Sequence, residues 1–241
     1  VPATPAAVTS TVTCAARAEK RLFLRRVPNH LQDLLLIADY EEAAGSARHD
    51  FVVEMPDGSS AAISAKGCLD GNNTNVFDRP ADVDEFVIWS ICMSPGADPR
   101  RNAWSGLHTR LSAEIITRRQ QVDGGVIWDW RCGTVGRPCA KLPPLSPALR
   151  TTAIGPWRLT PPCIYLMPSA LPAENLSPAP WQISDKPLLA ALHVAFGGVD
   201  AELNQVTIDV RREQEGVQRR TTVWREGTIV HQSEFTSIRR S

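Results

Sequence analysis

Long apolar runs are missing from this chain of 241 residues. No stretch approaches the roughly 20 consecutive apolar residues that a membrane-spanning helix needs, so we expect no membrane partner. The first 21 residues lack a basic start followed by a long apolar core. We therefore expect no secretory leader, and a cytoplasmic location. Six cysteines in a chain of this length do not make a disulfide-stabilised scaffold.

Net charge is also missing, because 26 basic residues balance 26 acidic ones. A general electrostatic attraction to nucleic acid is therefore excluded, and any such binding must come from local asymmetry of charge. Lysine is scarce, since only four of the basic residues are lysine and the rest are arginine. Arginine suits bidentate contacts to phosphate and guanine, although a GC-rich genome also explains the bias.

Residues 49–67 predict a β-hairpin, because apolar and polar residues alternate on both sides of the turn-forming stretch 56–59. A three-residue loop at 57–59 places Glu54 opposite Ala62 and Asp50 opposite Lys66, which gives two unlike faces. The apolar face holds Phe51, Val53, Met55, Ala61, Ile63 and Ala65. The polar face carries Asp50, Glu54, Ser64 and Lys66.

Asp50 together with Ser64-Ala65-Lys66 resembles the core motif of the PD-(D/E)xK nuclease superfamily, which includes many restriction endonucleases. The resemblance implies an α/β fold with a mixed central sheet flanked by helices, and Mg²⁺ held by acids that activate water beside the lysine. Ser64 stands where the family usually has Asp or Glu, and some members with Ser there take the missing acid from a nearby helix. The plainer interpretation is an amphipathic hairpin with a solvated Asp50–Lys66 pair.

Two expected helices offer the missing acid. A helix over 29–44 would place Glu42 near the centre of its apolar stripe, which makes Glu42 the first candidate metal ligand. A helix over 81–93 would open with Asp82, Asp84 and Glu85. Acids at a helix start usually serve the helix dipole, but these three are the next candidates, with Asp82 first among them.

Arginines mark two expected surfaces for double-stranded DNA. A helix over 104–121 has a basic side, and a strand over 126–130 follows it. After a helix over 185–197, a three-stranded meander is expected at 205–212, 217–225 and 228–236, with Ile208, Val223 and Val230 packing on that helix. The candidate DNA contacts are Arg110, Arg118, Arg211 and Arg220, and solvated faces explain them equally well.

The chain divides into four parts: a loose arm at 1–20, an α/β core at 21–142, a Pro-rich segment at 143–182 and the C-terminal helix with its meander at 183–241. The third part holds ten of the nineteen prolines, so we expect it to wrap over the core without long helices or central strands. Cys132 and Cys139 have six residues between them, which is wider than a usual zinc pair, and a metal there stays an open alternative.

Three functions follow from these patterns. The first is a Mg²⁺-dependent endodeoxyribonuclease, with a restriction endonuclease as the natural subtype and a homodimer as a possible assembly. The second is a non-catalytic module that binds nucleic acid or an acidic protein, and the third is a structural or assembly protein, for example of a virus. A Ser/His/Asp hydrolase is not supported, because no Gly-x-Ser-x-Gly occurs and no His has a recognisable partner.

Overall fold

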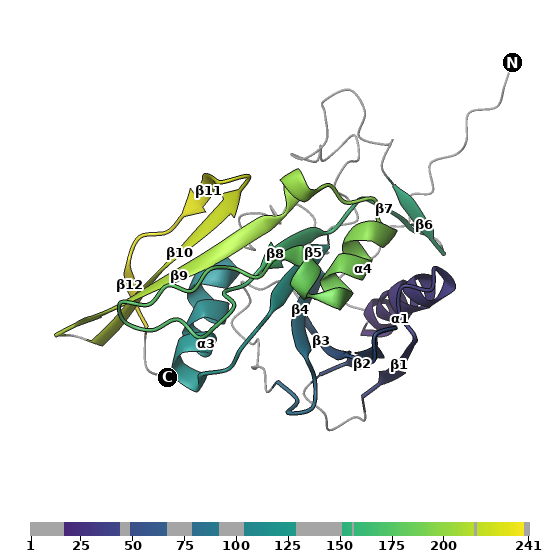
Figure 1. Ribbon diagram of the computed structural model, residues 1–241, viewed down its shortest axis with the longest axis horizontal. Helices are drawn as coiled ribbons and strands as arrows, with labels where there is room; N and C mark the ends of the chain where they lie inside the picture. The colour runs from purple at the N-terminus through teal and green to yellow at the C-terminus, as the bar shows by residue number, and fades with distance from the viewer. Residues whose placement is uncertain are drawn as a thin grey trace, which may run out of the picture.

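The computed structural model describes residues 17–43, 49–66, 79–91, 104–128, 151–155, 157–214 and 216–238. They form an α/β fold on one mixed, largely antiparallel sheet of ten strands (Figure 1). The strand order is β1-β2-β3-β4-β5-β8-β9-β10-β11, and the short β12 also pairs with β10. Strands β6 and β7 form a separate two-stranded sheet. Within these ranges, no helix combines the length and the apolar character that crossing a membrane requires.

The strands of the large sheet are β1 (Asp39–Glu42), β2 (Phe51–Glu54), β3 (Ser60–Lys66), β4 (Glu85–Ile91), β5 (Gly124–Trp128), β8 (Cys163–Leu166), β9 (Asn204–Glu213), β10 (Gly216–Arg225), β11 (Thr228–Gln232) and β12 (Thr236–Ser237). The small sheet pairs β6 (Thr152–Ile154) with β7 (Trp157–Leu159). The helices are α1 (Arg17–Asp33), the π-helical η1 (Leu107–Leu111), α3 (Ser112–Arg118), α4 (Pro187–Ala195) and two short 3₁₀ turns, η2 (Ile183–Asp185) and η3 (Asp200–Glu202).

Helices cover both faces of the large sheet and create two hydrophobic cores (Figure 1). On one face, α1 and α4 contribute Leu31 and Leu189 to a core that also contains Trp128. On the other face, η1 contributes Leu111 to a core that contains Ile208 of β9. Burial on both faces explains why β4 and β5 carry continuous apolar runs, at 86–89 and 126–128, rather than alternating apolar and polar residues.

The β2–β3 hairpin confirms the predicted apolar face and revises the register. Glu54 lies opposite Ser60 rather than Ala62, because the three-residue loop is 56–58, one place earlier than predicted. Gly58 closes that loop with a φ of +85°, a left-handed conformation that glycine adopts without strain. The pairing moves by two residues, so no side chain changes face. All six residues of the predicted apolar face are buried in one core.

The helix predicted over 81–93 is wrong, since this stretch contains the strand β4. β4 pairs in parallel with β3 on one side and with β5 on the other. Its run of apolar residues has no helical spacing, and a continuous run of this kind is typical of a strand that is buried on both faces. The acids at 82 and 84 therefore precede a strand and do not begin a helix.

The helix predicted over 29–44 is also wrong. The helix α1 lies earlier and ends at Asp33, and β1 then forms an edge of the sheet, antiparallel to β2. Pro28 was expected to precede a helix but lies inside α1. Buried residues on both sides of it, Leu24, Val27 and Leu31, hold this helix against the core, and tertiary packing of this kind stabilises helices more than local propensity does.

The Pro-rich segment contributes a central strand, contrary to expectation. Strand β8 lies between β5 and β9. Its four residues contain no proline, and Pro162 and Pro168 fall just outside them, so the ladder loses no N–H donor. The sheet is therefore continuous from the predicted core through this segment to the C-terminal meander.

The C-terminal helix and meander are confirmed as α4, β9, β10 and β11. Ile208 and Val223 are buried on one face of the meander, as predicted, but they pack against η1 and α3 rather than on α4. Val230 is 37% exposed, because the pairing of β10 with β11 is irregular beside it.

Buried charges join the starts of β4 and β5 to the start of α4. Asp123 is 1% exposed, and its Oδ2 accepts hydrogen bonds from Arg79 at 2.7 Å and from the backbone N–H of Phe86 at 2.8 Å. The ammonium of Lys186 lies 3.1 Å from Asp123 Oδ1 and 3.9 Å from the ring centre of Trp181. Each buried charge in this group thus has an opposite charge in contact, which burial of ions requires.

Glu85 belongs to the same region and caps α4. Its carboxylate accepts hydrogen bonds from the backbone N–H groups of Leu188 at 2.9 Å and Leu189 at 3.2 Å. Burial raises the pKa of Glu85 to about 7, although these two donors and Lys186 act in the opposite direction. Near neutral pH the carboxyl is therefore close to the midpoint of its titration.

We predict that Glu85→Gln removes a fall in stability that the wild-type protein shows between pH 4.5 and 7. The folded state binds the Glu85 proton more tightly than the unfolded chain does, so raising the pH through this window favours unfolding. A pKa near 7 against an ordinary 4.5 corresponds to roughly 3 kcal/mol.

Urea unfolding at pH 5 and pH 7.5 measures this effect as the difference between wild type and variant. The control is Asp82→Asn at an exposed neighbouring position, which should lose as much unfolding free energy between the two pH values as the wild type does. An equal loss in wild type and Glu85→Gln would contradict the prediction.

Candidate functional site

Asp50, Ser64 and Lys66 come together where β2 begins and β3 ends. The backbone N–H of Asp50 donates to the carbonyl of Ile63 at 2.8 Å, which extends the strand pairing to residue 50. The Asp50 carboxylate accepts the backbone N–H of Ala65 at 2.7 Å through Oδ2. Ser64 is fully buried, whereas Asp50 and Lys66 are half-buried. The hairpin thus holds its acid and its amine at the end away from the turn, as predicted. The predicted pairing of Asp50 directly opposite Lys66 is wrong, because the revised register continues to Asp50 opposite Ser64.

Lys66 is electrostatically unusual for a lysine near a protein surface. Burial lowers its pKa below the ordinary 10.5, and the Asp50 carboxylate opposes this with a smaller effect. The amine is therefore partly removed from water beside a negative charge. A lysine in this environment can orient a water molecule or accept its proton more readily than a solvated lysine can.

Lys66 lies at the end of the sheet where ligands commonly bind. β3, β4 and β5 run parallel, and Lys66 is the last residue of β3, level with Ser90 near the end of β4. In α/β sheets, ligands bind outside the carboxyl ends of parallel strands. The Asp50–Lys66 pair lies at that end.

Glu42 is not part of this cluster. It lies on the edge strand β1 opposite Phe51, and its carboxylate pairs with the guanidinium of Arg25 in α1, with one Nη2–Oε2 contact of 3.0 Å. The predicted role depended on a helix that the chain does not form at this point. In the strand, Glu42 is directed to a helix that covers the sheet.

The acids at 82, 84 and 85 lie at the opposite end of β3. The carboxylate of Asp84 accepts the backbone N–H of Ser60, and the backbone carbonyl of Asp82 accepts the Ser60 hydroxyl. Ser60 and Lys66 are six residues apart, which is about 20 Å along a strand. These acids are therefore too far away to share a metal ion with Asp50.

The fit of the predicted Mg²⁺ can be judged from this donor set. In the described part of the chain, no group of three or more His, Cys, Asp or Glu side chains is placed to hold a metal ion. Asp50 alone supplies one carboxylate, with Oδ2 already accepting the Ala65 N–H. Mg²⁺ commonly keeps several waters and binds through one or two carboxylates and substrate phosphates. The residues fit a water-rich site of that kind and not an all-protein cage.

The four arginines proposed for DNA contact do not form one surface patch of free charges. Arg118 pairs with Glu114 at 3.1 Å, and Arg220 pairs with Asp209 at 2.8 Å. Arg211 pairs with Glu213 at 3.1 Å. Arg211 and Arg220 share a face of the meander, as predicted, but both guanidinium groups stack over the ring of Phe235. Arg110 lies half-buried on η1.

A cluster around His108 is absent from the sequence-based candidates. His108 Nδ1 lies 2.9 Å from Ser233 Oγ, and its Nε2 lies 2.7 Å from Thr236 Oγ1. Burial, with the charge of Arg219 second, lowers the pKa of His108 to about 4, so the ring is neutral at physiological pH. These contacts join residues that are more than 100 positions apart in the sequence, so no local pattern predicts them. They fasten η1 to the last strands of the sheet.

The buried pair of Asp123 and Lys186 was missed as well. Asp123 stands in a stretch that reads as a turn, and Lys186 precedes a proline at a helix start. The one available signal was that Lys186 is among only four lysines. Cys132 and Cys139 lie outside the described residues, whereas Cys163 of β8 carries a free thiol.

No family model, no curated protein and no solved structure matches this chain.

We predict that Asp50→Asn lowers the pKa of Lys66 further, because the variant removes the negative charge that opposes the effect of burial. NMR titration of the lysine side chains measures this directly, and four lysines give a simple spectrum. Glu54→Gln, an exposed change on the same strand, should leave the Lys66 titration unaltered. A Lys66 pKa that does not respond to Asp50→Asn would show that the two groups are not coupled.

Proposed function

We propose that this protein is a metal-dependent endodeoxyribonuclease that hydrolyses phosphodiester bonds of double-stranded DNA, related in fold and mechanism to restriction endonucleases. The observation that carries the proposal is the desolvated Lys66 amine held beside Asp50 at the carboxyl end of β3. A mixed sheet covered by helices on both faces is the architecture that the resemblance implies.

In this proposal each residue of the cluster has a separate task. Asp50 would hold Mg²⁺ through the carboxylate oxygen that does not accept the Ala65 N–H. The bound metal would supply a water of lowered pKa and stabilise charge on the scissile phosphate. Lys66 would orient the attacking water and take up or share its proton. Ser64, which is fully buried two residues before Lys66 on β3, would support the strand that carries Lys66.

A non-catalytic binding module is the second candidate. It is favoured by one observation, namely that the described residues contain no group of three or more His, Cys, Asp or Glu side chains placed to hold a metal ion. Such a module would bind DNA or an acidic partner through residues that do not depend on metal. Arg118, Arg211 and Arg220 pair with acids, so they do not offer the binding module a stronger DNA-binding surface than they offer the nuclease.

A plasmid assay separates these functions. We predict that the purified chain nicks or linearises supercoiled plasmid with Mg²⁺ and fails with EDTA. Lys66→Ala and Asp50→Ala should each slow cleavage by about 100-fold or more, in the range for loss of a group that transfers or positions a proton.

Two controls keep the assay interpretable. Glu54→Gln and Glu42→Gln should cleave at the wild-type rate, because neither side chain belongs to the cluster. Asp50→Ala removes an acceptor of a backbone N–H, so circular dichroism must check that this variant keeps the wild-type fold. Cleavage by Lys66→Ala at the wild-type rate would refute the nuclease, and DNA binding without cleavage, with or without metal, would favour the binding module.

A further inference from the structure

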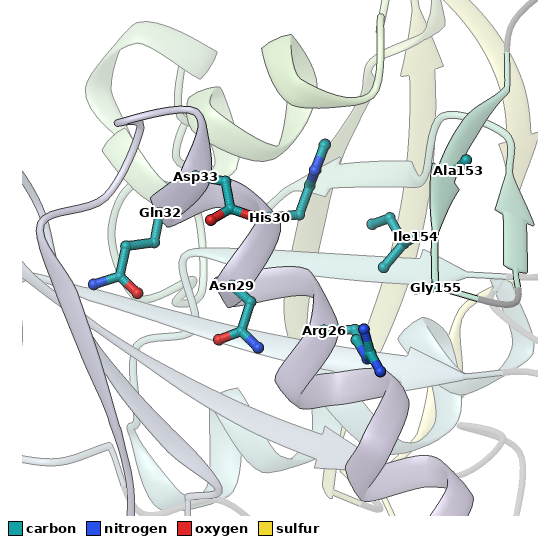
Figure 2. A pocket seen from close by; sticks show the side chains of 8 residues that line it. All are labelled: Arg26, Asn29, His30, Gln32, Asp33, Ala153, Ile154 and Gly155. Atoms are coloured by element: carbon teal, nitrogen blue, oxygen red, sulfur yellow. The ribbon is translucent and has the colours of Figure 1, made fainter.

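A polar cleft of about 340 Å³ lies between α1 and β6, and it shares no residue with the Asp50–Lys66 cluster (Figure 2). One helix provides most of its polar wall, and the small sheet provides the facing wall. The residues on which its chemistry depends are Arg26, Asn29, His30 and Asp33 of α1, with Ile154 and Gly155 opposite. Their spacing of three, four and seven residues places the four α1 side chains along one side of the helix.

Arg26 is the available positive charge of this cleft. Its neighbour Arg25 is committed to the ion pair with Glu42, whereas Arg26 is exposed and forms no ion pair with the residues that the structure describes. A guanidinium without a carboxylate partner retains a fork of donors that matches the oxygens of a carboxylate or phosphate.

Gly155 brings the facing wall close to Arg26. A Cβ atom at this position would lie 3.5 Å from the Arg26 guanidinium carbon, so the bare backbone and the guanidinium are in near contact. The φ of Gly155 is +54°, a conformation that suits glycine. Behind it, Ile154 is 4% exposed and gives the cleft an apolar floor.

Asn29 presents donors rather than acceptors to a ligand. Its side-chain oxygen accepts the hydroxyl of Tyr40, which leaves the amide NH₂ group for other partners. Figure 2 shows Arg26 projecting from the turn of α1 that precedes Asn29 and His30, with Ile154 on the facing strand. His30 packs its ring against Phe196 at 5.5 Å between ring centres, so this wall is held in place by the core.

Asp33 puts the opposite charge at the far end of the cleft. Arg26 and Asp33 are seven residues apart, about 10 Å along the helix axis. A ligand with negative charge at both ends would be repelled at Asp33. One with an oxyanion at one end and a hydrogen-bond donor at the other complements both.

We propose that this cleft binds a small molecule that carries a carboxylate or phosphate group, with the oxyanion held by Arg26 and Asn29 and a donor group directed to Asp33. A volume of about 340 Å³ lies at the lower end of the range for small-molecule sites. The carboxylate and the phosphate share the chemistry of recognition, and the experiment distinguishes them.

The test uses inorganic phosphate and acetate as probes, titrated separately into the full chain at constant ionic strength. Chemical shifts of the His30 imidazole report occupancy of the cleft. We expect saturable binding of at least one probe, a loss of affinity of tenfold or more in Arg26→Gln, and a change of less than twofold in Arg25→Gln. Saturation by phosphate alone or by acetate alone identifies the class of ligand.

Arg25→Gln is a matched control, because it removes the same charge one residue away on a different side of the helix. Equal weakening in both variants would mean that the anions respond only to surface charge, and it would overturn the proposal. Failure of both probes to saturate the wild-type protein would overturn it as well. Both positions are exposed, and circular dichroism should show that the variants keep the wild-type fold.

Discussion

The pairing of β3 with two different neighbours is the constraint on which the rest of this structure depends. β3 is antiparallel to β2 on one side and parallel to β4 on the other, and five of its seven residues are buried. The antiparallel partner is reached by a three-residue loop, whereas the parallel partner requires a longer return of the chain. This arrangement sends Lys66 to one end of the sheet and the acids at 82–85 to the other.

Buried charges give the other end of the sheet its own character. Asp123 and Lys186 come from segments on different sides of the Pro-rich stretch, and their contact links the start of β5 to the start of α4. Removing one partner from a buried ion pair usually costs about 3–5 kcal/mol, because the remaining charge is left unpaired. The capping of α4 by Glu85 adds a carboxyl that titrates near neutral pH. We interpret the contacts at this end as structural, and the end with Lys66 as the location of the proposed catalytic site.

Several arginines have structural contacts, which weakens the interpretation of the arginine-rich composition as a DNA-binding surface. Arg79, Arg118, Arg211 and Arg220 each contact a carboxylate, so the positive charge of these four is neutralised within the fold. Arg219 is 5% exposed and donates to backbone carbonyls of η1 and of the last strands. Against this background Arg26 differs, because it faces a cleft and has no acidic partner in the described chain.

Local patterns sufficed for much of the fold. Alternation of apolar and polar residues predicted the faces of the hairpin, and turn residues around Gly216 and Gly227 predicted the C-terminal meander. Alternation failed for β4 and β8, because a strand buried on both faces has no alternation to detect. It also failed at β1, whose polar residues are exposed at the edge of the sheet. Asp50, Ser64 and Lys66 could be grouped from the sequence since one hairpin carries all three.

By itself, the sequence determined which residues share a face of the hairpin, because side chains alternate along a strand whatever the surrounding fold. It also determined that helix α4 precedes a meander. Only the tertiary structure decided that Glu42 turns to Arg25, that Asp123 meets Lys186, and that a cleft opens beside Arg26. These contacts join residues that are 17 to more than 100 positions apart, and they depend on the packing of whole elements rather than on any local period.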